Sequence, residues 1–136
     1  MTNEKLKHLE FIQNIITRMN STSFQIKSWT ITIVTALLGV YASTTKIDFI
    51  FLAILPTIFF WCLDTYYLMQ ERKFRGLYND VAGVSEEPNQ IKLFEINTEL
   101  YKGGTCSYWN VLRSTTIFLT YFPIVVVLLI AYFYLR

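Results

Sequence analysis

IDFIFLAILPTIFFWCLDTYYLM, residues 47–69, is the stretch that decides the fold of this chain. Its 23 residues are mostly aliphatic and aromatic, and none is basic. A helix of this length rises about 34 Å, which is enough to cross the apolar core of a bilayer. Its one charge far from the ends is Asp64, and a lone carboxylate at such depth ordinarily faces a partner or water rather than lipid. The stretch therefore predicts a membrane protein.

The composition of the 136-residue chain agrees with this prediction and favours a single domain. Hydrophobic residues make up 53% and aromatic residues 17%, above the norm for soluble proteins, while charged residues make up only 16%. The two cysteines, Cys62 and Cys106, have no metal-ligand spacing and no expected disulfide, and no cofactor is expected. The first 20 residues lack a compact apolar region, so we expect the first span itself to direct insertion.

Two further apolar runs complete the predicted fold class, an all-α membrane protein with three transmembrane helices. Residues 28–45 form the first candidate span and residues 114–135 the third, about 27 Å and 33 Å long. The loop at residues 44–46 is too short to hold another element. Residues 24–69 are therefore predicted to be an antiparallel transmembrane hairpin, and residues 109–136 to hold the third helix.

One face of the first span carries only small or polar groups. They recur at alternating spacings of three and four residues, which places them in one stripe along a helix. Such a stripe is typical of close helix packing, and a water path lined by hydroxyl groups is the alternative. The third span repeats the pattern more weakly at Thr116, Thr120 and Pro123. The members of the first stripe are Gln25, Ser28, Thr32, Thr35, Gly39 and Ala42.

Asp64 in the second span has a candidate partner at about the same distance from the hairpin turn. Counted from the shared turn, Lys27 lies about 17 residues back and Asp64 about 18 residues forward, or roughly 25 to 27 Å away on each helix. A Lys27–Asp64 contact would ease burial of the carboxylate. Hydrogen bonding of Asp64 to threonines or to interfacial water is the alternative.

The parts outside the spans are predicted to be helical as well. Residues 1–23 show apolar side chains at helical spacing and form an amphipathic helix, followed by a bend at residues 20–22 or by one continuous helix. The lone His8 is expected to be solvated or to pack between helices. In the polar insert, residues 70–108, the second helix continues past the membrane, residues 85–88 favour a new helical turn, and residues 91–97 suit either a helix or an extended segment.

The distribution of basic residues predicts the orientation. Three spans put ten of the twelve Lys and Arg residues on the side of the N-terminus and leave Lys46 and Arg136 on the other. Positive charge favours the cytoplasm, so the N-terminal helix and the insert should be cytoplasmic and the C-terminus outside a bacterial inner membrane. Six of these residues either set topology and contact anionic lipid or form an anion or nucleotide receptor: Arg72, Lys73, Arg75, Lys92, Lys102 and Arg113.

The sequence carries no familiar catalytic signature. One histidine cannot support a Ser/His/acid or Cys/His set, and there is no phosphate-binding glycine loop, HExxH or CxxC motif. The carboxylates of the insert have no partner that suggests acid–base chemistry. We therefore expect a protein that is not an enzyme.

Two segments, NSTSFQIKSWTITIVTALLGVYA (20–42) and LPTIFFWCLDTYYLMQERKFRGLYNDV (55–81), followed more weakly by LFEINTELY (93–101), resemble a family of small bacterial membrane proteins of antiphage operons. They are similar to the membrane component of Hailong-type defence, a small channel encoded beside a nucleotidyltransferase. The resemblance implies an oligomeric channel that a nucleotide-derived or short DNA ligand holds closed and that opens on infection to depolarise the membrane. It assigns no ligand-contact residues in this chain.

The leading hypothesis is therefore a homo-oligomeric, three-span ion channel gated by its cytosolic layer. Ser28, Thr32, Thr35 and Gly39 would line or narrow the path, and Lys27 with Asp64 would sit at its cytoplasmic mouth or lock the helices together. The competing hypothesis is a non-conducting membrane anchor or sensor whose insert docks a soluble partner.

Overall fold

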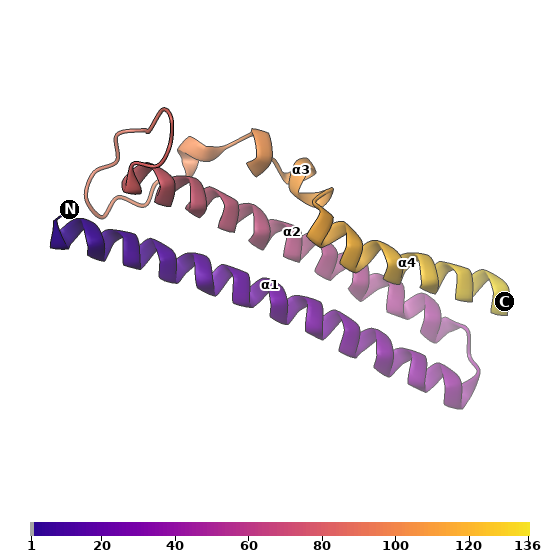
Figure 1. Cartoon of the computed structure of the whole chain (residues 1–136). Coiled ribbons are helices and arrows are strands. Elements are labelled where there is room, and N and C mark those ends of the chain that lie inside the picture. The colour runs from indigo at the N-terminus through magenta and orange to yellow at the C-terminus, as the bar shows by residue number, and fades with distance from the viewer. Residues whose placement is uncertain (1) are drawn as a thin grey trace.

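The computed structural model shows a long two-helix hairpin with a shorter third helix along one side (Figure 1). It describes residues 2–136 apart from the side chain of Thr105, and over this range it contains no strand. The N-terminus and the loop after the second helix lie at one end, and the C-terminus lies at the other end beside the hairpin turn (Figure 1). The helices are α1 (Asn3–Thr44), α2 (Asp48–Ala82), α3 (Tyr108–Leu112) and α4 (Thr115–Leu135), with single 3-10 turns η1 (Glu99–Tyr101) and η2 (Gly104–Cys106).

Three of these helices, α1, α2 and α4, are long and apolar enough to cross a membrane. They cover the three predicted spans to within one residue: α1 ends one residue before the predicted end of the first, and α2 and α4 each begin one residue after the predicted start of the second and third. The turn between α1 and α2 is as short as expected, because Thr45 adopts a left-handed conformation and its N–H bonds to the carbonyl of Tyr41. The prediction of three long apolar helices is thus confirmed.

Helix α1 is continuous over 42 residues, or about 63 Å. Of the two alternatives at residues 20–22, the continuous helix forms and the bend does not. The hydroxyl of Thr22 donates to the carbonyl of Arg18 at 2.9 Å, which fits inside a helix, instead of capping a new one. Helix α2 also runs on past its apolar stretch to Ala82, so the N-terminal half of α1 has a partner along its whole length.

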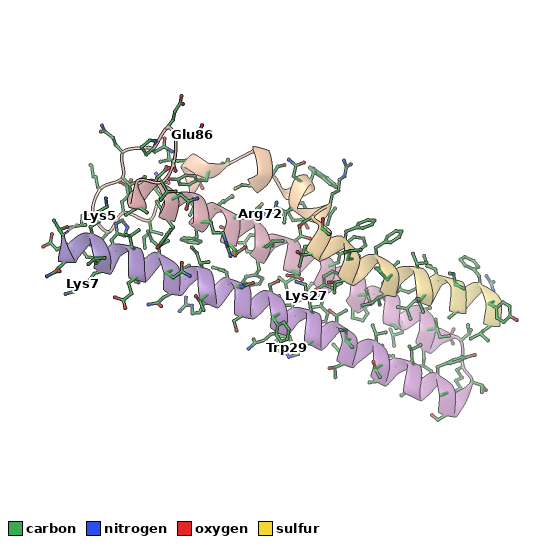
Figure 2. All side chains as sticks on the ribbon, viewed as in Figure 1. Lys5, Lys7, Lys27, Trp29, Arg72 and Glu86 are labelled. Atoms are coloured by element: carbon green, nitrogen blue, oxygen red, sulfur yellow. The ribbon has the colours of Figure 1, made fainter. Side chains whose placement is uncertain are left out.

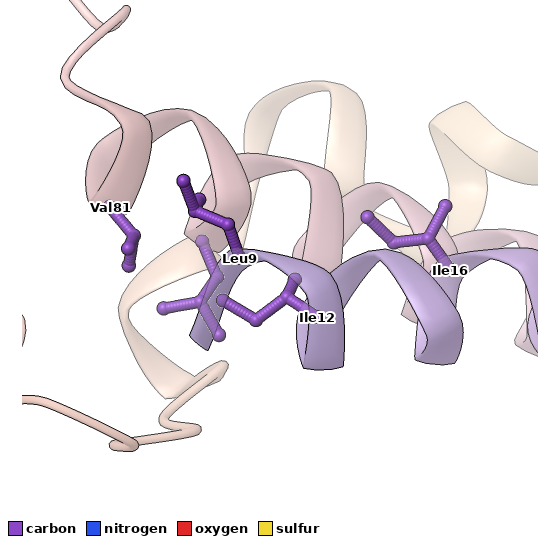
Figure 3. Packing of buried hydrophobic residues seen from close by; sticks show 5 residues of the cluster. Leu9, Ile12, Ile16 and Val81 are labelled. Atoms are coloured by element: carbon purple, nitrogen blue, oxygen red, sulfur yellow. The ribbon is translucent and has the colours of Figure 1, made fainter. Parts of the chain in front are cut away.

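The hairpin has two separate apolar cores. Near the N-terminus, Leu9, Ile12 and Ile16 of α1 pack against Leu77 and Val81 of α2 (Figure 3). The spacings of three and four residues put these α1 side chains on one face of the helix. Near the turn, a second core joins all three long helices. It consists of Val34, Ile50, Ala53, Ile54 and Leu128.

The segment between α2 and α3 differs from the prediction in one place. The expected helical turn at residues 85–88 is absent. Ser85 does not cap a new helix, because its hydroxyl donates to the Asp80 carboxylate at 2.5 Å and folds the chain back onto the end of α2. Residues 91–97, which suited either a helix or an extended segment, form a reverse turn in which Phe94 has a φ of 60°.

Candidate functional site: a buried charge layer and a basic cleft

A layer of polar side chains separates the two apolar cores. Asp64 of α2 is fully buried, and the ammonium group of Lys27 on α1 lies 2.6 Å from its Oδ2. The hydroxyl of Tyr121 on α4 donates to the same oxygen at 2.9 Å, and the hydroxyl of Ser23 donates to Oδ1. Lys27 also donates to Ser23 Oγ at 2.8 Å. One carboxylate therefore joins all three long helices.

The count from the hairpin turn brought Lys27 and Asp64 to one height, and the structure brings them into contact. Sequence reasoning missed Ser23 and Tyr121. Ser23 could have been found, because it precedes Lys27 by four residues and must share its face of the helix. Tyr121 could not, because its height depends on the path of the whole insert.

The layer also holds aromatic rings and threonine hydroxyls. Trp61 stacks on Tyr121 with ring centroids 6.2 Å apart. The indole nitrogen of Trp61 is buried and has no acceptor among the described residues. The buried hydroxyls of Thr30 and Thr57 donate to the carbonyls four residues before them, at 2.8 and 2.9 Å. These threonines are satisfied within their own helices and do not reach Asp64.

The small polar stripe of α1 faces away from the rest of the chain. Ser28, Thr32, Thr35 and Gly39 are all exposed, as are Gln25 and Ala42. The line of α1 that packs inward is a different one, formed by Ser23, Ile26, Thr30 and Val34. A Cβ atom added to Gly39 would meet no other atom within 4 Å. The stripe is therefore exposed on the outside of its own chain, although Thr35 at its edge lines a cavity of about 290 Å³ between α1 and α4.

Three of the six predicted contact residues line one cleft. Arg72, Arg75 and Lys102 surround a cavity of about 560 Å³ between α2 and the turns η1 and η2. Each cation is held in place: Arg72 donates to the Ser114 hydroxyl at 3.1 Å, Arg75 to Glu71 at 2.6 Å, and Lys102 pairs with Glu99. Figure 2 shows Arg72 on α2, near the middle of the molecule. The other lining residues are Gly76, Asn79, Tyr101, Gly103 and Cys106.

Tyr101 forms a fixed wall of this cleft. Its ring lies on the backbone of α2 at Gly76, and its hydroxyl donates to Asp80 Oδ2 at 2.5 Å. Burial alone would raise the pKa of the Asp80 carboxyl, but hydrogen bonds from Ser85, Tyr101 and Asn89 outweigh it and lower that pKa. Burial and the neighbouring carboxylate raise the pKa of the Tyr101 hydroxyl. The pair is therefore an ionised acid bound to a neutral phenol.

The other three predicted contact residues do not line the cleft. Lys73 lies near Glu99 instead. The pKa of the Glu99 carboxyl is lowered by the hydrogen bond from Lys102 and further by the charge of Lys73. Lys92 is exposed in the turn that carries Phe94, and Arg113 is exposed at the end of α3. The structure thus divides the six cations into one cleft and three separate positions.

The side chain of His8 on α1 is buried and forms hydrogen bonds with the turn that carries Phe94. Its Nε2 lies 3.1 Å from the carbonyl oxygen of Glu95, and its Nδ1 lies 3.4 Å from the backbone nitrogen of Phe94. Because a carbonyl can only accept and an amide N–H can only donate, Nε2 carries the proton and Nδ1 accepts. His8 is therefore not solvated, and its hydrogen bonds are to this turn rather than to a second helix. The described residues contain no group of three metal-ligating side chains.

A scan against protein-family models, a search of curated proteins and a search of solved structures each found no match to this chain.

Proposed function

We propose that this chain is the subunit of a homo-oligomeric ion channel in a bacterial inner membrane, gated from the cytosol by a nucleotide-type ligand. The observation that carries the proposal is the outward-facing stripe of Ser28, Thr32, Thr35 and Gly39, which its own chain leaves uncovered. In an oligomer these groups would face water in a central path or the small residues of a neighbouring subunit.

The stripe is poorly suited to face lipid. The hydroxyls of Ser28 and Thr32 donate to carbonyls of the preceding turn, at 3.1 and 2.9 Å, but their oxygens keep lone pairs that lipid cannot satisfy. The flanks of α1 carry large apolar side chains that lipid suits better, among them the exposed Trp29 and Ile31. The helix therefore has a lipid-compatible side and a polar side within one span.

The charge layer supports a fixed arrangement of the three long helices at the cytoplasmic end of the span. In the proposed orientation the N-terminal half of α1 and the insert are cytosolic, and Lys27 begins the first span on that side. The Lys27 side chain is 17% exposed, while its partner Asp64 is fully buried. Because the two charges neutralise each other and face inward, away from the stripe, the pair would lock the three helices together rather than place a charge at the mouth of the path.

The cleft of Arg72, Arg75 and Lys102 is the proposed ligand site. Its three cations suit phosphate groups, and its volume of about 560 Å³ falls within the usual range for small-molecule sites. The resemblance to membrane components of antiphage operons supports a ligand made by a partner nucleotidyltransferase, and a role in defence by depolarisation. The alternative for these cations remains contact with anionic lipid.

Conductance of the purified protein in planar bilayers tests the proposal. We expect current from the wild-type chain and a clear loss of current from the double variant Thr32→Leu with Thr35→Leu, because two bulky apolar groups would close and dry the path. The matched control is Ile31→Leu with Val40→Leu, which changes exposed side chains of the same helix outside the stripe. Absence of current from every variant, with and without ligand, would favour the non-conducting anchor.

Ligand control is tested on the same bilayers with ATP and a short single-stranded DNA as probes. Arg75→Gln with Lys102→Gln should abolish the response of the current to the effective probe, because both cations line the cleft. The control variant Arg113→Gln should retain it. An equal effect of both variants would show that the cations act through general charge or lipid contact.

A further inference from the structure

The cytosolic end of the chain exposes an apolar knob that neither its own fold nor the membrane covers. The knob consists of Leu93, Phe94 and Ile96, each of which is at least 41% exposed. His8, which holds the knob, precedes Lys27 by 19 residues on a continuous helix, or about 29 Å. In the proposed orientation the knob therefore lies well away from lipid.

The fold holds the knob in a strained conformation. Phe94 has a φ of 60°, a left-handed conformation that is unfavourable for an ordinary L-residue and is usually left to glycine. The two contacts of His8 with Phe94 and Glu95 maintain this turn. Backbone strain of this kind concentrates at functional sites, where the surrounding structure enforces it. Here its effect is to display an aromatic ring on the surface.

A complementary groove lies on the opposite flank of the same hairpin end. It has a volume of about 550 Å³, and its apolar lining comes from Leu6 and Leu9 of α1 with Tyr78, Ala82 and Val84. Leu6 and His8 are two residues apart, which is about 200° around a helix. The groove and the knob thus lie at the same height but on different sides of α1.

The knob and the groove carry side chains of opposite charge. Lys92 precedes the knob, Glu10 lines the groove, and both are exposed. Within the described chain neither side chain forms an ion pair. Because membrane-anchored copies share one orientation, the knob of one copy meets the groove of the next by rotation about the membrane normal. A contact between two different surfaces repeats from copy to copy and closes into a ring.

We propose that the knob of Leu93, Phe94 and Ile96 inserts into the groove at Leu6 and Val84 of a neighbouring copy, with Lys92 beside the neighbour's Glu10. This inference rests on the proposed homo-oligomer and specifies its cytosolic contact. The membrane already aligns the copies, so association loses less orientational freedom than it would in solution.

Disulfide cross-linking in membrane vesicles tests the contact. In a background of Cys62→Ser and Cys106→Ser, the pair Phe94→Cys with Leu6→Cys should give a ladder of oligomers after mild oxidation. Neither single variant should give a ladder. The matched control is Phe94→Cys with Phe24→Cys, which should give none. Phe24 lies 18 residues from Leu6, and therefore on the same face of α1 after five turns, but about 27 Å further along.

Charge reversal tests the orientation of the contact. Lys92→Glu and Glu10→Lys should each lower the cross-linking yield about twofold to fivefold, and the two together should restore it. Failure of the double reversal to restore the yield would overturn the Lys92–Glu10 pairing.

Particle mass in native nanodiscs separates failure of this inference from failure of the proposed function. An oligomer without the Phe94–Leu6 ladder would overturn the inference and leave the homo-oligomer intact. A monomer would overturn both. Efficient dimers from Phe94→Cys alone would show a two-fold contact and overturn the head-to-tail arrangement.

Discussion

Asp64 receives hydrogen bonds from both helices that flank α2. The buried polar contacts among the three long helices therefore depend on this one side chain. A buried carboxylate is tolerated only when its charge and lone pairs are satisfied. Lys27 supplies the charge, and Ser23 and Tyr121 supply further donors. Removal of one charge of the Lys27–Asp64 pair leaves the other without its counter-charge, whereas removal of both charges does not.

Asp64→Asn should therefore lower the free energy of unfolding by about 3 to 5 kcal/mol, measured by thermal unfolding in detergent. Tyr121→Phe removes a single hydrogen bond and should lose about 1 kcal/mol. The double variant Lys27→Met with Asp64→Leu should be more stable than Asp64→Asn. A double variant that is no more stable than the single one would contradict this account. Unchanged oligomer size and gating in Asp64→Asn would count against a functional role for the pair.

At the scale of elements, the insert is attached to the hairpin by a few specific contacts rather than by a core of its own. Tyr101 packs on Gly76 and bonds to Asp80, and His8 bonds to the turn at Phe94. These contacts come from one face of each long helix. The position of the basic cleft depends on the first of them, because Tyr101 and Lys102 are neighbours in sequence.

Gly76→Ala should loosen the cleft. An alanine Cβ at this position would lie 2.7 Å from Cδ1 of the Tyr101 ring, so the ring must move. We expect a loss of about 1 to 3 kcal/mol in the docking of η1 and faster amide hydrogen exchange in residues 98–107. The control is Gly39→Ala, which meets no atom within 4 Å and should leave exchange in that segment unchanged. Equal exchange in the two variants would contradict the role of Gly76.

The Asp80–Tyr101 contact also predicts a pH dependence. The folded state lowers the pKa of Asp80 below its ordinary 3.8, so its contribution is present above that pH and is lost as pH falls through the folded pKa. The folded state raises the pKa of Tyr101 above its ordinary 10.0, so its contribution is present below pH 10.0 and is lost at higher pH. Docking of the insert on α2, measured by amide hydrogen exchange, should be most stable in the pH range between these two limits. Asp80→Asn should remove the acid-side dependence, and an unchanged acid profile would contradict it.

At the scale of the whole molecule, α1 is a single rod of 42 residues that carries both the His8 contact and the polar stripe. In the proposed channel, a signal that moves the N-terminal end of α1 would therefore have a direct mechanical route to the span. Helix α2 runs beside it for 35 residues and carries the cleft residues Arg72 and Arg75 together with Asp64. The basic cleft, the charge layer and the apolar parts of α1 and α2 are thus linked by continuous helices.

A flexible point in this rod should uncouple its two ends. Asn20→Gly with Ser21→Gly changes two exposed positions and weakens the helix by about 1 kcal/mol at each. We expect probe binding at the cleft to persist while the response of the bilayer current decreases. Asn20→Ala with Ser21→Ala strengthens the helix and should retain the response. A full response from the glycine variant would show that α1 does not carry the signal.

The spans, the short hairpin turn and the common height of Lys27 and Asp64 followed from the sequence alone. The physical reason is that apolar length and helical rise are local properties, which a count of residues captures. The orientation of the charges, the ligand and the oligomer remain predictions that the fold does not test.

Only the tertiary structure decided which other residues join these parts. Tyr121 bonds to Asp64, and Lys102 lines the same cleft as Arg75, because the segment between α2 and α4 folds back along α2. That path depends on side-chain contacts at Gly76, Asp80 and His8, which leave no periodic pattern in the sequence. For the same reason no pattern indicated that Phe94 would be held outward with a positive φ, whereas the three apolar helices follow from local composition and length.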